Sequence, residues 1–232
     1  MKGLENKNFI PNLSFDCVIF GFNGKLLKIL ILEYQNTGLY ALPGGFVETN
    51  QSLDDAVKQG VKDRTGLDNV FLDQFYIFGE LERANPKDMK RILAANNDDT
   101  EENSWMLERF LTVGFYALIN YEEVTPEPDH YSDSIGWYSV DELPQLMMDH
   151  NKIVEKALQV LRNNLSEKLI GMNLLPQKFT MKQLQMVFEA VLGQTLRRTT
   201  FQRKMLSLDA LERHEKLFQG KAHKAPYLYS FK

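Results

Sequence analysis

The spacing of hydrophobic residues changes along the chain, from runs typical of β-strands in the first two thirds to helical spacing near the end. Runs rich in β-branched and aromatic residues predict strands. These runs are Phe15–Phe22, Leu26–Tyr34, Tyr40–Leu42, Val70–Glu82, Phe110–Tyr121 and Ser134–Val140. Asn23-Gly24 predicts a hairpin between the first two runs. Gly44-Gly45 predicts a turn after the third run, and Gly79 predicts a bulge in the fourth.

Two segments of this first part have helical spacing instead. The first comprises residues 52–65, with Gly66 as its predicted C-cap; its core-facing residues are Leu53, Ala56, Val57 and Val61. The second begins with Asp149 as its predicted cap; its apolar stripe is Ile153, Val154, Ala157, Leu158 and Leu161. Residues 83–104 are polar, acidic and rich in turn residues, so we expect a mobile flap there.

The remainder of the chain begins with a connector and a capped helix. Residues 165–176 contain many Leu, Ile and Met residues, which predicts a partly buried connector. Thr180-x-x-Gln183 predicts a capping box at the start of a helix that ends at Gly193.

A second short helix and a β-hairpin are predicted to follow. Thr199-x-x-Gln202 has the spacing of another capping signal, and the helix it begins would bury Phe201, Met205 and Leu208. The strands Leu211–Phe218 and Pro226–Phe231 lie on either side of a basic turn. Two short helices joined by a tight turn and followed by a β-hairpin are typical of a winged helix-turn-helix domain. We expect this domain in residues 177–232.

Composition adds the compartment and the class of protein. With 232 residues, the chain is long enough for one large or two modest domains. The single Cys17 lies in an apolar run, which predicts a small buried hydrophobe and a reducing environment. No secretory signal pattern and no run of about 18 apolar residues is present, so we expect a cytoplasmic protein that does not span a membrane.

The net charge of −4 is unevenly distributed. Residues 174–232 hold 11 Lys and Arg residues and four acidic ones, a balance of +7 that leaves −11 for residues 1–173. Such asymmetry favours a nucleic-acid-binding domain joined to an acidic one, although a solvated basic surface would have the same composition. Candidate phosphate contacts are Arg198, Arg203, Lys204, Lys221, His223 and Lys224, and candidate base contacts are Thr200, Gln202 and Arg203.

Residues 44–67 contain glycine and apolar residues at the spacing of a known metal-binding motif. The segment reads GGFVETNQSLDDAVKQGVKDRTGL. Gly45, Val61, Gly66 and Leu67 match the Nudix box, which this stretch resembles. In Nudix hydrolases the box binds a divalent metal and a pyrophosphate. The resemblance implies a Nudix-type α/β/α sandwich with a mixed sheet, so that the fold class is α+β with a C-terminal winged helix.

The charged positions of the box differ from the family pattern. Gln51 stands in place of the first Glu and Gln59 in place of the Arg. Gly60, Asp63 and Arg64 occupy the three acidic positions that follow and share one helix face. Mg²⁺ needs several converging oxygen ligands, and an Arg side chain repels it. We therefore expect no catalytic residues, no metal and no cofactor, and the same segment would also serve as a plain amphipathic helix.

The whole chain, with a Nudix-like domain in residues 1–164 and the segment NLLPQKFTMKQLQMVFEAVLGQTLRRTTFQRKML behind it, resembles the Nudix-related transcriptional regulators of bacteria. The resemblance implies a regulator, in most cases a repressor, that binds a double-stranded DNA operator as a homodimer and responds to a small effector. One branch senses ADP-ribose through an Arg-Asp-Pro-Arg type motif, in place of which this chain has residues 83–87, RANPK. Another branch responds to pentoses such as arabinose.

An effector in this fold would lie over the sheet, between the box and the expected flap. The candidate effector-binding residues are Glu33, Gly45, Phe46, Glu48 and Trp105. Carboxylates and an aromatic face suit a sugar, whereas Trp105 would serve equally well to anchor the insertion or to fill a dimer interface. Two other classes stay open: a Nudix hydrolase of a nucleoside diphosphate derivative with rearranged metal ligands, and an interaction module that binds no DNA.

Overall fold

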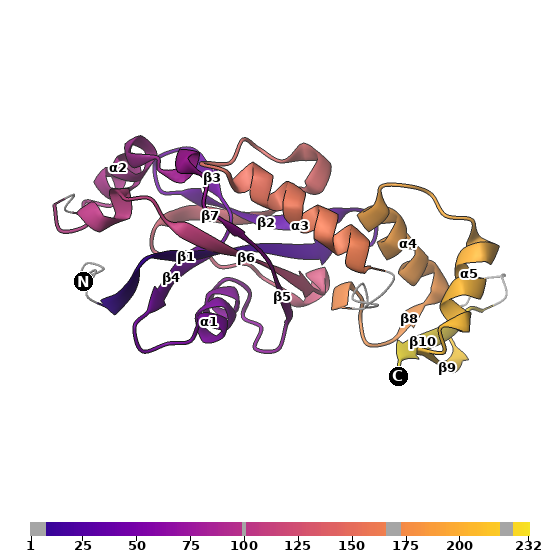
Figure 1. Cartoon of the computed structure of the whole chain (residues 1–232). Coiled ribbons are helices and arrows are strands. Elements are labelled where there is room, and N and C mark those ends of the chain that lie inside the picture. The colour runs from indigo at the N-terminus through magenta and orange to yellow at the C-terminus, as the bar shows by residue number, and fades with distance from the viewer. Residues whose placement is uncertain (1–7, 99–100, 166–172, 219–224) are drawn as a thin grey trace.

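A mixed β-sheet forms the centre of the N-terminal domain (Figure 1). The computed structural model describes residues 8–98, 101–165, 173–218 and 225–232. Within them, seven strands form this sheet: β1 (Phe9–Phe22), β2 (Leu27–Tyr34), β3 (Leu39–Ala41), β4 (Gly44–Glu48), β5 (Phe71–Phe78), β6 (Leu111–Ile119) and β7 (Ser132–Ser139). The main path is β3-β2-β1-β6-β5, β4 pairs with β1, and β7 pairs with β2. The β1–β6 pair is parallel, and the other pairs are antiparallel.

Helices cover both faces of this sheet (Figure 1). The helices of the domain are α1 (Leu53–Thr65), α2 (Pro86–Ala95) and α3 (His150–Asn164), and its short 3-10 turns are Leu81–Arg83, Ser104–Leu107, Tyr121–Glu123 and Val140–Glu142. Alternate residues of β1 point to opposite faces: Val18 and Phe20 join the core beneath α3, whereas Cys17 and Ile19 join the core above α1. The predicted α/β/α sandwich and the burial of Cys17 are therefore confirmed.

The box helix forms where its sequence signals place it. Ser52 is the N-cap of α1 and accepts a hydrogen bond from the Asp55 N–H, and Gly66 ends the helix in the left-handed conformation, with φ of 73°. The glycines before it were interpreted wrongly. Gly44 and Gly45 belong to strand β4 and pair with β1, because the chain turns before Gly44 and not at it.

Two further expectations for the N-terminal domain are wrong. The expected flap contains helix α2, which begins at Pro86 with Asn85 as its N-cap; the Asn85 side chain accepts a hydrogen bond from the Asp88 N–H. Asn before Pro is a start signal for a helix, and the polar composition of the segment concealed it. Gly79 follows β5, and the bulge lies between Gln74 and Tyr76.

The C-terminal domain is a winged helix, as predicted. It contains α4 (Met181–Leu192), α5 (Arg198–Ser207) and, among the described residues, a three-stranded sheet of β8 (Phe179–Thr180), β10 (Tyr227–Phe231) and β9 (Leu211–Lys216), in that order. Both halves of the Thr180–Gln183 capping box are present, and Gly193 ends α4 with φ of 68°. The second capping signal is wrong, because Arg197 is the N-cap of α5 and its side chain makes no capping bond to a described residue. Leu208 is 42% exposed and does not join the core.

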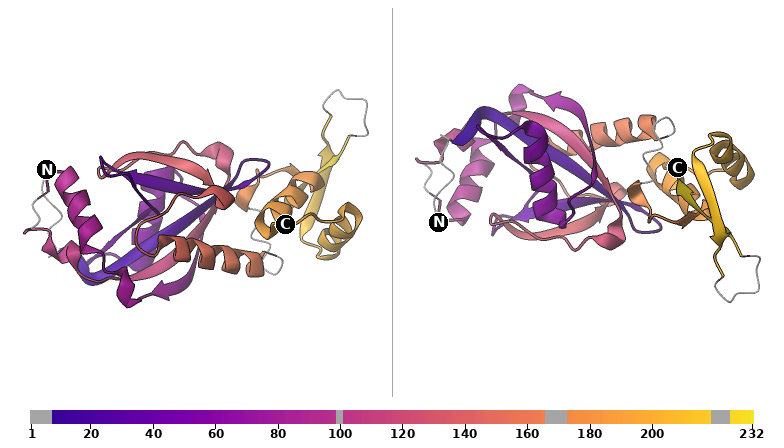
Figure 2. Two further views of the ribbon diagram at one scale, coloured as in Figure 1. Left: turned by 90° about the horizontal axis from the view of Figure 1, so that it is seen from above. Right: turned by 90° about the horizontal axis from the view of Figure 1, so that it is seen from below.

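A continuous apolar core joins the two domains, which lie end to end (Figure 2). Leu161 and Leu165 at the end of α3 belong to the same cluster as Leu184 and Val191 of α4. The Arg162 Nε also donates a hydrogen bond of 2.8 Å to the backbone carbonyl of Val191. Part of the predicted connector, Leu174 and Leu175, is buried in this core, and residues 166–172 lie outside the described residues. No described helix is long and apolar enough to cross a bilayer.

Candidate functional site

A cavity of about 310 Å³ opens between the sheet, α2 and the start of α3. Its apolar wall is rich in methionine and aromatic residues: Phe15, Phe46, Met89, Ile92, Met106, Phe110, Met147 and Met148. Its polar wall contains Asp16, Tyr34, Arg83, Glu108, Asp129, Tyr131 and His150. An apolar cavity with a few converging polar groups is the usual form of a small-molecule site.

Arg83 is the centre of a buried ion network beside this cavity. Its Nη1 lies 2.5 Å from Asp149 Oδ1 and its Nη2 lies 3.3 Å from Asp16 Oδ2, and its side chain is only 4% exposed. The Arg83 Nε has no hydrogen-bond partner among the described residues. Asp149 is thus not the side-chain cap of α3 that its position predicts, because its carboxylate is bonded to Arg83.

His150 completes the network and is held neutral. The Leu42 N–H donates a 3.0 Å hydrogen bond to His150 Nδ1, and His150 Nε2 lies 3.6 Å from Asp16 Oδ1. Burial lowers the pKa of His150, and Arg83 lowers it further, against the opposing effect of the Asp16 and Asp149 carboxylates. Because Nδ1 accepts a hydrogen bond, it carries no proton, and the imidazole keeps a single N–H.

A neutral buried histidine makes stability depend on pH. Unfolding releases His150 to its ordinary pKa of about 6.5, so the unfolded chain binds a proton that the folded chain excludes. We expect the contribution of His150 to the free energy of unfolding to be fully present above about pH 6.5. Below that pH the free energy of unfolding should fall by up to roughly 1.4 kcal/mol per pH unit. His150→Asn supplies another acceptor for the Leu42 N–H. It should flatten the dependence of the free energy of unfolding on pH, measured by urea denaturation between about pH 5 and 7. The exposed His130 provides the control: His130→Asn should keep the wild-type slope, and equal slopes in both variants would contradict the assignment.

The cavity contains two of the five predicted effector residues. Gly45 and Phe46 line it, whereas Glu33, Glu48 and Trp105 are not among the described residues that do. Trp105 is buried directly behind the wall, with its ring 4.8 Å from that of Phe46. Glu33 accepts a 3.2 Å hydrogen bond from Ser134 between β2 and β7, and Glu48 is exposed at the end of β4.

The ion network itself is not apparent from the sequence. Asp16, Arg83, Asp149 and His150 are separated by up to 134 positions, so no local spacing brings them together. One signal was available: Asp16 is a charged residue inside an apolar strand, and a buried charge requires a partner.

The box helix does not offer the ligands that Mg²⁺ requires. Gly60 lies against the Phe15 ring, to which an added Cβ would come within 3.0 Å. Asp63 Oδ1 accepts a 2.6 Å hydrogen bond from the Gln59 amide, and Arg64 forms an ion pair with Asp129. No group of three or more His, Cys, Asp or Glu residues converges as a metal site in the described part of the chain. The residues present therefore do not fit the divalent ion of a Nudix hydrolase.

In the winged helix, α5 presents a polar and basic surface. Phe201 and Met205 face the core, and the Phe201 ring lies 5.1 Å from that of Phe188 on α4. The predicted DNA contacts on α5 face outward: Arg198, Thr200, Arg203 and Lys204 are exposed, and Gln202 is partly exposed. A helix held by its apolar face with cationic residues outward has the arrangement of a recognition helix.

Side chains from α4 hold the turn before α5. Glu189 Oε1 accepts hydrogen bonds from the Leu196 N–H at 2.7 Å and from the Gln185 amide at 2.9 Å. The same Gln185 amide donates to the Leu196 carbonyl at 2.9 Å. These bonds hold the turn against α4 and thereby restrict how α5 is oriented relative to α4.

The hairpin of β9 and β10 places two cations beside an aromatic ring. Arg213 and Lys216 lie over the Tyr227 ring, at 4.7 Å and 5.2 Å from its centroid. The predicted contacts Lys221, His223 and Lys224 lie outside the described residues.

The similarities to known proteins follow the same division into two domains. Residues 11–158 match the NUDIX domain, and residues 171–231 match the NrtR DNA-binding winged helix domain. A repressor of Acinetobacter baylyi, described as the ADPR responsive transcriptional repressor NtrR, is 26% identical over 209 residues, which cover 87% of this chain and 75% of the repressor. An ADP-ribose pyrophosphatase of Methanocaldococcus jannaschii is 44% identical over 43 residues, which cover 17% of this chain and 25% of that protein.

Solved structures share the fold over nearly the full length. Shewanella oneidensis NrtR in complex with a 27mer DNA superposes with a TM-score of 0.73 at 23% identity, covering 95% of this chain and 93% of that one. A MutT/nudix family protein from Enterococcus faecalis gives 0.71 at 20% identity, covering 96% and 88%.

Proposed function

Because this chain belongs to the NrtR family, which joins a Nudix domain to a winged-helix DNA-binding domain, we propose that it is a transcriptional repressor controlled by a small effector. The observation that carries the proposal is the outward basic surface of α5, held in place by Phe201 and Met205. We assign effector binding to residues 1–164, the connector to residues 165–176 and DNA binding to residues 177–232.

We expect two copies of the chain to bind one operator. One recognition helix covers one half-site, and two half-sites lie about one helical turn apart on a palindromic operator. The repressor is therefore a homodimer on its operator. In each copy, Arg198, Arg203 and Lys204 contact phosphates, and Thr200, Gln202 and Arg203 face the base edges.

Selection from a random DNA library tests DNA binding without knowledge of the operator. The purified full chain should enrich a palindromic sequence, and its affinity for that sequence should fall steeply as salt rises. If no sequence is enriched at any salt concentration, the protein is not a DNA-binding repressor, and an interaction module is favoured.

The charges around the cavity favour a neutral, hydroxyl-rich effector over a diphosphate. Asp16, Glu108 and Asp129 line it, and the guanidinium of Arg83 is already bonded to two carboxylates. Carboxylates accept hydrogen bonds from sugar hydroxyls, whereas a diphosphate needs unpaired cations. The volume of about 310 Å³ is at the small end of ligand pockets. We therefore place a pentose such as arabinose first, and ADP-ribose, named in the description of the A. baylyi repressor, second.

Thermal unfolding of the protein with each compound distinguishes these effectors. A saturating pentose should raise the Tm by roughly 5–10 °C, because a ligand that binds the folded state stabilises it by mass action. Glu108→Gln should weaken this shift, whereas Glu127→Gln, outside the cavity lining, should preserve it. A Tm rise with ADP-ribose and none with pentoses would reverse the order of the two effectors.

Helix α3 links the cavity to the winged-helix domain. Its first residue, His150, lines the cavity, and Arg162 in its last turn bonds the Val191 carbonyl of α4. If the protein has two conformations that differ in the position of α3, an effector with different affinity for the two would shift the recognition helices and change the DNA affinity. We expect no efficient hydrolysis, since no group of Mg²⁺ ligands converges on the box helix among the described residues.

A further inference from the structure

The last turn of α1 carries a cation at a position where the Nudix box has a carboxylate. Arg64 is that residue, and its side chain is 12% exposed. Its guanidinium pairs with Asp129, whose side chain is 24% exposed, in the segment that precedes β7. The Arg64 carbonyl also accepts a 3.2 Å hydrogen bond from the Glu127 N–H. Arg64 therefore holds this segment through its side chain and its backbone.

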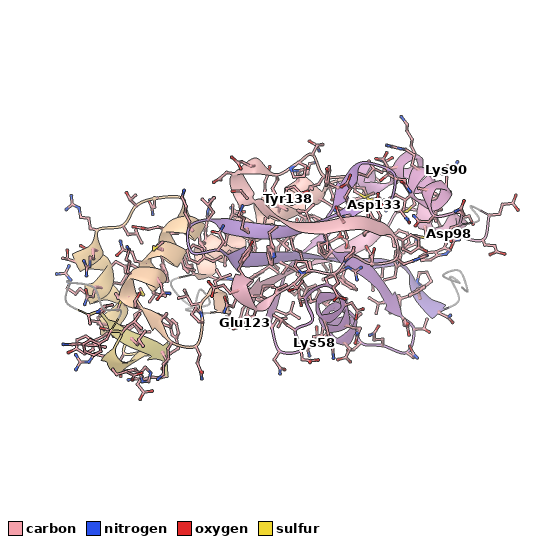
Figure 3. The ribbon with its side chains drawn as sticks, turned by 180° about the vertical axis from the view of Figure 1, so that it is seen from behind. Lys58, Lys90, Asp98, Glu123, Asp133 and Tyr138 are labelled. Carbon is pink, nitrogen blue, oxygen red and sulfur yellow. The ribbon has the colours of Figure 1, made fainter. Side chains whose placement is uncertain are left out.

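The partner carboxylate organises one wall of the cavity. While Asp129 Oδ2 bonds Arg64, Asp129 Oδ1 accepts hydrogen bonds from the Tyr131 N–H at 3.1 Å and from the Ser132 hydroxyl at 2.6 Å. Asp129 and Tyr131 both line the cavity. The Tyr131 hydroxyl donates a 2.9 Å hydrogen bond to Asp98, beyond the end of α2 (Figure 3). Loss of the Arg64 charge would thus loosen the wall as well as the ion pair.

The electrostatic influence of the pair extends to the cavity interior. Burial raises the pKa of the Tyr34 hydroxyl above its ordinary range, the Asp129 and Asp16 carboxylates raise it further, and Arg64 opposes them. Tyr34 lines the cavity, so the positive charge of Arg64 acts on a group that faces this space. The Arg64 Nε has no hydrogen-bond partner among the described residues.

We infer that the Arg64 guanidinium, paired with Asp129, takes the place of the divalent cation, as a fixed positive group that assembles the effector cavity without metal. The neighbouring positions agree with this substitution, because Gly60 is covered by Phe15 and Asp63 is bonded to Gln59. On this inference, the loss of other charged residues of the box together with the positive charge of Arg64 leaves a pocket that needs no metal. The inference rests on the cavity being the effector site, but the pair can be tested without an effector.

Thermal unfolding of the full chain in EDTA, Mg²⁺ and Mn²⁺ tests this role. The wild-type Tm should be the same in all three. Arg64→Gln should lower the Tm by roughly 5 °C or more, since it leaves a partly buried carboxylate unpaired, and no divalent cation should restore it. The matched control is Lys62→Gln on the same helix, which removes an exposed ion pair with Asp68 and should change the Tm by about 2 °C or less.

The charge-reversed variant Arg64→Glu supplies a second readout. It places a carboxylate beside Asp129 and should gain Mn²⁺ binding, seen as loss of the free Mn²⁺ signal in electron paramagnetic resonance, together with a Mn²⁺-dependent Tm. If this variant does not fold in EDTA, Arg64→Gln alone decides. A wild-type Tm raised by Mg²⁺, equal effects of Arg64→Gln and Lys62→Gln, or a folded Arg64→Glu that takes up no Mn²⁺ would each overturn the inference. None of these results bears on DNA binding.

Discussion

Arg83→Ala should lower the free energy of unfolding by about 3–5 kcal/mol, the cost of leaving buried carboxylates without their cation. The Arg83 guanidinium bonds Asp149 and Asp16, and the side chains of these two residues are 8% and 10% exposed. Urea denaturation measures the change, which corresponds to a fall in Tm of roughly 10 °C. The control is Arg91→Ala: Arg91 is half exposed and 3.5 Å from Asp88, and its loss should cost about 0–1 kcal/mol.

A double variant separates lost charge from lost volume. The substitution Arg83→Ala leaves two carboxylates unpaired, and Asp149→Asn removes one of them. The double variant should therefore be more stable than Arg83→Ala alone. If the double variant shows the sum of the two single losses, the ion network is not the cause. A loss for Arg83→Ala no greater than that for Arg91→Ala would also contradict the network.

Arg203→Ala should weaken binding to the selected operator by about 10- to 100-fold, the range of a base contact by an arginine fork. Arg203 is exposed on α5, two residues beyond the buried Phe201. Fluorescence anisotropy over a series of salt concentrations gives the affinity and its salt slope. If Arg203 contacts only phosphate, the loss should be equal for all sequences and the slope should fall by about one.

The control for this measurement lies on the other domain. Lys58 is exposed on α1, away from the winged helix (Figure 3), and Lys58→Ala removes the same charge without touching α5. Its operator affinity should equal that of the wild type. Equal affinities for Arg203→Ala and the wild type would place the DNA-binding surface elsewhere.

Elements with their own capping signals were predictable from the sequence. Ser52 and Gly66 delimit α1, and the Thr180–Gln183 capping box begins α4, because these signals act within a few residues of each other. Most strands of the sheet were predictable from their apolar runs, since both faces of the sheet are covered, but β4 was not. Local physics therefore accounts for the α/β/α sandwich and for the ends of α1 and α4.

The site was less predictable because its polar groups meet only in the folded chain. Asp149 has the sequence position of a helix cap, but the distant Arg83 takes its carboxylate. Residues 83–104 have the composition of a flap, yet Ile92 and Leu93 of α2 are buried. In both cases a tertiary contact outweighs the local pattern.

The DNA affinity of the full chain with and without effector tests most directly whether this protein is an effector-controlled repressor. We expect binding to the selected operator to change by about tenfold or more when a pentose saturates the cavity, equivalent to a coupling free energy of about 1.4 kcal/mol. An operator affinity that no pentose and no ADP-ribose alters, together with hydrolysis of ADP-ribose at about 1 s⁻¹ or faster, would identify an enzyme and contradict the repressor.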